Sequence, residues 1–533
     1  MQCFCYNSRM KVDVKNLPES LELSHKIIAS LYQDLLEKQS ELTSTQSQAE
    51  SYKAKYENIL EQIKLAKQQR FAPSSEKDIL HLDMFDEAGV ELPVDVQEQL
   101  SDKDDNVTVS GHTKKKKPKR CALPKDLPRE EVIHDIPDDE KVCGCGEHLI
   151  KIGEELTEQL KYIPAKLSVV VHVRPKYACK PCQENVKIAA MPSMLLPKSI
   201  ATPELVAHII IAKYCDHLPL YRQEQMWKRI AVNLPRSSLC GWVLKTAELC
   251  EPLIGLLRES ITSYDYAQAD ETTVQVMNEK DRKNTSKSYM WCYRGGGDHH
   301  SNIVYEYQET RGGYHAEKFL SGFKGYLQTD AYSGYNWVDK NKDIIAVGCH
   351  AHARRNFADL VKMSKTPGLA HQGVIFYKKL YKIEKHAREN NLTPEQRHAL
   401  RKKESKPILD AFKQWLDHHH TKTSEKGKIG KAIRYCLNHW KQLASFLKDG
   451  RVEIDNNLLE NTIRPFAIGR KNWMFMGSPS GAKAGATFYS LIETCKANSI
   501  DPQKYLTQML HKIRSCKSDD DYRKLLPQNM QMD

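Results

Sequence analysis

Three acidic residues on widely separated segments are the side chains best suited to chemistry. Asp270 lies in YAQADETTVQV, Asp330 in GYLQTDAYSGY and Glu460 in EIDNNLLENTIRPFAIGRKNWMF. Carboxylates from separate segments can converge into a cage for two hard divalent cations, and two such ions can drive in-line attack on a phosphodiester. The pattern therefore indicates a metal-dependent phosphoryl-transfer site.

Six segments after residue 263 predict the elements that position the two aspartates. The β-rich segments with short polar connections are 264–277, 288–295 and 302–308. The next segments predict a helix over 316–323, a further strand over 325–332, and a strand that runs into a helix over 343–362. Three antiparallel strands followed by strand–helix units are typical of a ribonuclease H-like sheet. Asp270 would lie on the first strand and Asp330 at the end of the fourth. Those strands are neighbours in that fold, so the two carboxylates could meet.

A long charged stretch separates these strands from Glu460. Residues from about 370 to 450 follow helical patterns throughout, which predicts an all-helical insertion into the sheet domain. After the insertion, Asp455 could cap a short helix that carries Glu460 and ends near Pro465.

Basic residues follow the glutamate closely. Arg464 stands four positions after Glu460, and hence on the same helical face. Arg470 and Lys471 would provide hydrogen-bond donors for phosphates. Trp473 could stack on a base, although a packed aromatic is the more common outcome.

Neighbouring residues compete for these roles. A lone acidic residue is most often a surface charge, and the chain has 68 of them. The acidic rivals closest in sequence to the three carboxylates are Asp265, Glu271, Glu453 and Asp455. Cys349, His350 and His352 also resemble metal ligands. Their place at a strand-to-helix junction favours a role in supporting the fold or the site over metal ligation.

The N-terminal region predicts self-association. From Ile28 to Ala66 apolar residues recur in heptads, so a coiled coil is expected, with a helix folded back on its own protein as the alternative. Residues 71–130 lose this periodicity and predict a linker. The linker contains a basic run that could bind DNA phosphates or remain a solvated tail: Lys114, Lys115, Lys116, Lys117, Lys119 and Arg120.

Two cysteine pairs predict a zinc ribbon. Cys143 and Cys145 precede an alternating stretch, and Cys179 and Cys182 follow it. Two pairs joined by a β-hairpin suit tetrahedral Zn²⁺, which substitutes for a core that so small a segment lacks; free thiols are the alternative. Residues 200–262 then predict helices, with Ser237 or Ser238 capping the second stretch. These helices could be a helix-turn-helix-like DNA reader or a spacer packed on the next domain.

Composition agrees with a nucleic-acid partner without proving one. Lys and Arg number 80 against 68 Asp and Glu, a net charge of +12. No apolar run approaches a membrane span and the N-terminus lacks a secretory signal, so a cytoplasmic protein without membrane contact is expected. Fifteen cysteines in so long a chain do not suggest a disulfide framework.

The chain resembles transposases of the insertion-sequence-66 group, which belong to the DDE superfamily. The resemblance runs from the predicted coiled coil to the C-terminus. Its strongest segments are LQTDAYSGYN, GCHAHARRNF, KYCDHLPLYRQEQ and EIDNNLLENTIRPFAIGRKNWMFMGS. Long collinear segments are far more specific than a three-letter catalytic signature. The C-x-C spacing of the first cysteine pair is one departure.

The resemblance implies a DDE domain in which Asp270, Asp330 and Glu460 bind Mg²⁺, two ions per active site, with Mn²⁺ able to substitute. The implied activity is cleavage of double-stranded DNA at the element ends and joining of the 3′ ends to target DNA. Structural Zn²⁺, a homo-oligomer and small accessory proteins encoded by the same element are also implied. Two other functions stay open: a non-catalytic DNA-binding repressor derived from a transposase, and a ribonuclease H-like nuclease that does not join DNA.

The expected architecture is multidomain α+β. It comprises a coiled coil, a linker, a zinc ribbon, a helical domain, a ribonuclease H-like α/β catalytic domain with an all-helical insertion, and C-terminal helices. The corresponding ranges are 1–70, 71–130, 131–195, 196–262, 263–480 and 481–533.

Overall fold

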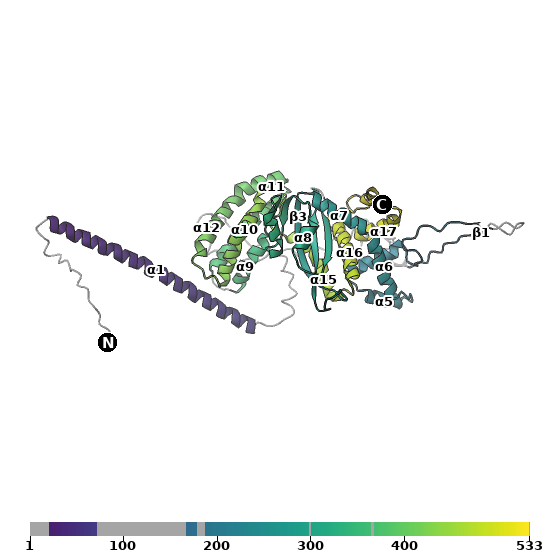
Figure 1. Cartoon of the computed structure of the whole chain (residues 1–533), viewed down its shortest axis with the longest axis horizontal. Helices are drawn as coiled ribbons and strands as arrows, with labels where there is room; N and C mark the ends of the chain where they lie inside the picture. The colour runs from purple at the N-terminus through teal and green to yellow at the C-terminus, as the bar shows by residue number, and fades with distance from the viewer. Residues whose placement is uncertain (1–20, 72–166, 178–186, 298–299, 364–366, 532–533) are drawn as a thin grey trace, which may run out of the picture. The chain divides into compact units, whose positions relative to one another are not determined.

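The computed structural model describes five stretches of the chain (Figure 1): residues 21–71, 167–177, 187–297, 300–363 and 367–531. The chain divides into two compact units, one formed by residues 102–192 and the other by residues 1–101 and 193–533. Among the helices of these stretches, none is both long and apolar enough to cross a membrane.

The unit of residues 102–192 contains a two-stranded antiparallel sheet. Its strands are β1 (Lys176–Tyr177) and β2 (Lys187–Ile188). A hairpin was expected between the two cysteine pairs, yet the partner of β1 lies after the second pair. The four predicted zinc ligands and the basic run lie outside the described residues: Cys143, Cys145, Cys179, Cys182 and residues 114–120.

The helix α1 (Leu21–Phe71) confirms that the heptad region is helical. It contains neither Gly nor Pro, so no backbone break interrupts it. Its predicted seam is exposed: Ile28 and Leu35 keep 62% of their surface and Leu42 keeps 59%. Apolar side chains this exposed on one stripe are typical of a helix that pairs with another. Pairing of α1 with a second helix stays a prediction.

A five-stranded mixed sheet forms the centre of the other unit, in the order β5-β4-β3-β6-β7. The first three strands are antiparallel, and β6 and β7 run parallel to β3. All five strands were predicted. Their bounds are β3 (Tyr266–Gln275), β4 (Lys287–Gly295), β5 (Asn302–Gln308), β6 (Gly325–Gln328) and β7 (Ile344–Val347).

One hydrophobic core contains residues of the sheet and of the helices that precede and follow the sheet in the sequence. Leu253 and Leu257 before the sheet, Tyr293 within it, and Leu491 and Tyr505 after it all belong to this core. The helices of residues 200–262, expected as either a DNA reader or a spacer, therefore share a core with the sheet, and so does the C-terminal element. The helices are α4 (Pro203–Tyr214), α5 (Leu220–Arg229), α6 (Arg236–Leu249), α7 (Glu251–Ser263), α8 (Tyr314–Phe319), α16 (Pro479–Ala497), α17 (Pro502–Lys512) and α18 (Asp519–Lys524).

The edge strand β5 is covered by α16. Ser490 accepts a hydrogen bond from the Tyr305 backbone N–H at 2.8 Å, and Thr494 accepts one from the Ile303 N–H at 3.0 Å. These hydroxyl groups thus accept hydrogen bonds from backbone N–H groups of β5. On an uncovered sheet edge the same N–H groups could pair with another chain.

The region between β7 and Glu460 is helical throughout its described part, as predicted. Its helices have hydrophobic cores of their own, with Phe357, Tyr377 and Phe412 in one and Leu380 and Phe446 in another. Figure 1 shows α9, α10 and α12 together on the side of the sheet away from α16. The helices are α9 (His350–Met363), α10 (Leu369–Glu389), α11 (Pro394–Leu400), a π-helical turn (Arg401–Ser405), α12 (Lys406–His420), α13 (Lys428–Asn438) and α14 (Trp440–Ala444).

Two local predictions were wrong and a third holds in part. The helix that carries Glu460, α15 (Asn457–Trp473), does not end near Pro465 but continues through it. Its buried face before and after the proline holds the helix together, which outweighs the proline's cost of about 3 kcal/mol. Asn456 occupies its N-cap position without a side-chain cap bond, and Asp455 accepts the backbone N–H of Asn457, the first residue of the helix, at 3.1 Å. Neither Ser237 nor Ser238 caps α6, which begins directly after Pro235.

Candidate active site

The sheet places two of the predicted carboxylates on neighbouring parallel strands. Gln268 on β3 is aligned with Gln328, the last residue of β6. Asp270 lies two residues beyond the first of these and Asp330 two residues beyond the second. Because parallel strands run in step, the two aspartates reach the same level of the sheet. Asp270 stays within β3, opposite Cys292 of β4.

The charges of the acidic residues meet around Asp270. Burial raises the pKa of its carboxyl well above the usual range, and the charges of Asp330, Glu271 and Glu460 raise it further. A hydrogen bond from the Glu271 backbone N–H to Oδ1, at 2.8 Å, opposes this shift. The charges of Asp330, Glu271 and Glu460 at Asp270 favour a bound cation, because a cation offsets this repulsion.

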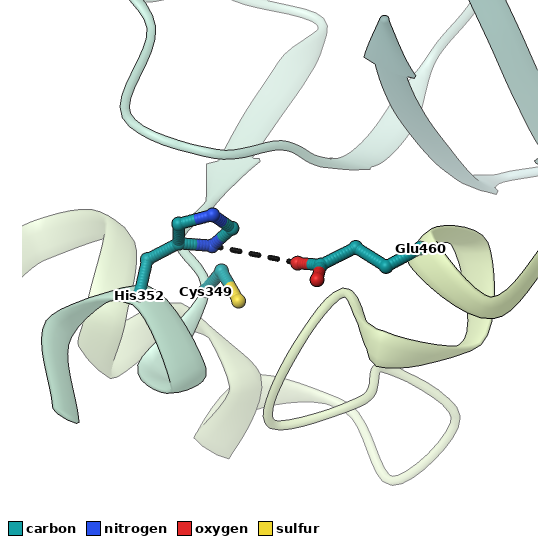
Figure 2. A group of neighbouring side chains, drawn as sticks. All are labelled: Cys349, His352 and Glu460. Atoms are coloured by element: carbon teal, nitrogen blue, oxygen red, sulfur yellow. Dashed lines mark ion pairs between the residues drawn. The ribbon is translucent and has the colours of Figure 1, made fainter. Parts of the chain in front are cut away.

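Glu460 enters the cluster from the first turn of α15. Its side chain is buried, and its Oε1 lies 3.6 Å from Nδ1 of His352 on α9 (Figure 2). The far end of α15 is fixed to β3, since Arg470 donates to the Thr273 Oγ1 at 3.0 Å and also to the Thr273 carbonyl. The helix therefore lies along the strand that carries Asp270.

Cys349 connects the elements that hold Glu460. Its Sγ accepts a hydrogen bond from the Asn456 backbone N–H at 3.3 Å, so the end of β7 is tied to the N-cap residue of α15. Ligand atoms of Cys349, His352 and Glu460 lie within 4.8 Å of one another. Figure 2 shows the three side chains converging from the segment just before α9, from α9 itself and from α15. Such a group could hold a metal ion, so a supporting role and metal ligation both stay open for the Cys-His segment.

His350 is part of the fold. It is fully buried, and its Nε2 lies 2.8 Å from the Leu443 carbonyl oxygen. Burial lowers the pKa of His350 to about 4, so the ring is neutral in the folded protein at pH 7.

The acidic rivals all have partners elsewhere. A charged or hydroxyl partner holds each at 2.6 to 2.8 Å: Asp265 with Arg451, Glu271 with Arg311, Glu453 with Arg397, and Asp455 with Tyr381. The alternatives to Glu460 within its own segment, Glu453 and Asp455, are therefore engaged in the fold. Glu271 contributes to the charge around Asp270 while it binds an arginine.

The basic residues predicted for DNA have different surroundings. Arg470 serves the fold through its bonds to β3, and burial lowers its pKa. Lys471 is exposed and Arg464 is half-buried on α15. Trp473 packs edge-on against Phe466, with ring centroids 5.6 Å apart, which is the packed-aromatic alternative.

Sequence reasoning missed Arg311. Its only signal was a basic residue directly after a strand, in ETRGGYH. Its proximity to the carboxylates depends on the pairing with Glu271, which tertiary structure alone reveals.

The acidic cluster suits divalent cations. Carboxylate oxygens are the preferred ligands of Mg²⁺ and Mn²⁺, and burial together with the neighbouring carboxylates disfavours the charged form of Asp270 unless a cation binds. Asp270, Asp330 and Glu460 are the residues that would hold the ions.

Four family models match the chain in sequence order. They are "Transposase C of IS166 homeodomain" over residues 58–132, "zinc-finger binding domain of transposase IS66" over 140–183, "Transposase IS66 family" over 198–484 and "IS66 C-terminal element" over 490–528. The zinc-finger match covers all four predicted cysteine ligands, and the third match covers the three carboxylates.

Three proteins of Sinorhizobium fredii (strain NBRC 101917 / NGR234) are similar over most of their length. Uncharacterized protein y4hP is 33% identical over 75% of this chain and 75% of its own. Uncharacterized protein y4qI is 34% identical over 78% and 79%, and Uncharacterized protein y4jD is 33% identical over 77% and 82%. With matched domains from the zipper region to the C-terminal element, this chain belongs to the IS66 family of transposases.

Proposed function

We propose that the protein binds the ends of its insertion sequence, cleaves the DNA there and joins the 3′ ends to target DNA. The observation that carries the proposal is the convergence of charge on Asp270. Asp330 and Glu460, far from it in sequence, both raise the pKa of its buried carboxyl. Within a DDE-type transposase domain, such a cluster supports assignment of these three residues as the catalytic triad.

Asp270, Asp330 and Glu460 would hold two Mg²⁺ ions, or Mn²⁺ in their place. When bound, such ions lower the pKa of an attacking hydroxyl and stabilise the leaving oxygen of a phosphodiester. The chain itself supplies rigid positioning: Asp270 is fixed within a central strand, and the Glu460 helix is tied to β3 and to the end of β7.

Each of the remaining parts of the proposal rests on an observation of its own. The sheet order β5-β4-β3-β6-β7 supports a ribonuclease H-like catalytic domain with an all-helical insertion. The zinc-finger match supports structural Zn²⁺ on the two cysteine pairs. The exposed stripe of α1 supports a homo-oligomer through a coiled coil. Accessory proteins of the same element and association with the nucleoid are expected from family membership.

A DNA contact surface is part of the proposal as well. The basic run at 114–120 and the exposed Lys471 with Arg464 on α15 remain candidates for phosphate contacts. Arg470 is a weaker candidate than the sequence suggested, since its guanidinium binds β3.

An assay with labelled element ends, a target plasmid and Mg²⁺ tests this function. Joined products support the transposase. Cut ends without joining favour the nuclease alternative, and shifted DNA without cutting favours the repressor. The control omits Mg²⁺ and adds Ca²⁺, which permits DNA binding and separates a loss of chemistry from a loss of binding.

A further inference from the structure

Arg311 lies between the end of β5 and the start of α8, next to the acidic cluster. Its guanidinium Nε donates to Oε1 of the buried Glu271 at 2.6 Å. Glu271 directly follows Asp270 in β3, and Tyr335 donates to its other oxygen at 2.9 Å. The position of Arg311 is therefore set by a carboxylate that is itself held on both oxygens.

A tyrosine supports the same guanidinium from its flat face. The Arg311 guanidinium carbon lies 3.7 Å from the centroid of the Tyr332 ring, and the Tyr332 hydroxyl donates to the Arg311 carbonyl at 2.8 Å. Stacking and the ion pair together restrict the side chain without surrounding it. Its side chain keeps 41% of its surface exposed.

The stacked tyrosine also connects Arg311 to the second carboxylate. The Tyr332 backbone N–H donates to Oδ1 of Asp330 at 3.1 Å. Burial lowers the pKa of Arg311, but the hydrogen bond and charge of Glu271, with contributions from Tyr332 and Asp330, raise it overall. The guanidinium is thus a fixed positive charge within reach of the field of Asp330.

The outer end of the guanidinium is available to a ligand. In the described part of the chain, Nη1 and Nη2 of Arg311 form no hydrogen bond to another residue, whereas Nε is used. A half-exposed arginine held at Nε and stacked on a ring presents two parallel N–H donors, the geometry that matches two phosphate oxygens.

We propose that Arg311 binds a phosphate of the DNA strand being cut, beside the carboxylate cluster. The inference rests on the function proposed above and adds a contact residue to it. The carboxylate cluster by itself repels a polyanion. A fixed guanidinium on the rim provides the attraction that places the backbone there.

The competing explanation is purely structural: Arg311 would only neutralise the buried Glu271. The two explanations differ in what the Arg311→Ala variant does to the salt dependence of DNA binding. An arginine that only neutralises Glu271 contacts no phosphate, so its removal from a folded protein would leave that salt dependence unchanged. Removal of a phosphate-binding arginine would lower it by one phosphate contact.

The test measures the affinity for element-end DNA in Ca²⁺ at several salt concentrations, for folded variants with wild-type helical content. Arg311→Ala should weaken binding by about tenfold and lower the slope of log affinity against log salt by about 0.9, the value for one lost phosphate contact. Arg311→Lys should restore most of the slope and only part of the affinity.

Arg523→Ala is the matched control, because Arg523 also pairs with a glutamate, at 2.8 Å, and its side chain is 45% exposed. It should leave affinity and slope unchanged. A folded Arg311→Ala protein with the wild-type slope overturns the inference alone. Wild-type protein that does not bind element ends overturns the proposed function together with it.

Discussion

Replacement of Asp270 by asparagine should separate DNA cleavage from both DNA binding and folding. Asparagine has the size of aspartate, and its side-chain oxygen can still accept the bond from the Glu271 backbone N–H. The variant therefore removes a charge and little else. Cleavage should fall by at least roughly 10²- to 10³-fold, because an electrostatic group at the reacting centre is lost.

The metal-free variant should also be more stable than the wild type. Asp270 is surrounded by protein groups, and three neighbouring carboxylates raise its pKa further. Two like charges about 6 Å apart at an effective dielectric constant of about 20 repel by about 3 kcal/mol. Residual solvent contact and counterions screen part of that, which leaves about 1–2 kcal/mol of gain in unfolding free energy. Chelated samples should melt about 2–4 °C higher than wild type.

Three measurements check this: nicking of labelled element ends in Mg²⁺, end binding in Ca²⁺, and thermal melting in chelator. Asp265→Asn is the matched control, since Asp265 lies just before β3 and pairs with Arg451 at 2.8 Å. It should retain cleavage. Full cleavage by Asp270→Asn would refute the triad, and a lower melting temperature for that variant would refute the repulsion argument.

Three further predictions concern the fold and the zinc segment. In the folded protein the pKa of His350 is about 4, so the ring is neutral at pH 7. In the unfolded chain the same ring binds a proton below about pH 6.5. The free energy of unfolding therefore decreases as the pH falls from 7 towards 4. Urea unfolding should show a loss of roughly 2 kcal/mol at pH 5 that His350→Gln abolishes; an unchanged pH dependence in the variant would contradict this. Ser490→Ala and Thr494→Ala should each cost about 1–3 kcal/mol in urea unfolding, because each leaves a backbone N–H of β5 unsatisfied. Thr487→Ala is the control, because Thr487 is half-buried on the same helix and its hydroxyl donates to the Lys483 carbonyl of that helix. Metal analysis of purified protein should find zinc, and less than one equivalent per chain would count against the ribbon.

The strands were predictable because their signals are local. Alternation in the segments that became β3, β4 and β5 depends on which side chains face the core, and each strand carries that pattern by itself. The insertion was predictable for a similar reason, since helical periodicity persists through α10 and α12. Pro465 misled the prediction because its cost is local, whereas the packing of the surrounding helix is not.

The residues of the candidate site likewise fall into those that the sequence indicated and those that it did not. Asp270, Asp330 and Glu460 were candidates from the sequence because their segments resemble those of a known family and because carboxylates on separate segments can form a metal site. The partners of Glu460 and Glu271 could not be selected, since His352 and Arg311 reach them only through the packing of separate elements.

The sequence by itself determined the family and the order of elements along the chain, and it indicated three candidate carboxylates. Only the tertiary structure decided how they are supported. It paired Glu453 with Arg397 and left Glu460 facing His352, and it placed a fixed Arg311 beside Asp330. The physical reason is that charge, burial and hydrogen bonding act over a few ångströms in space, whatever the separation of the residues in sequence.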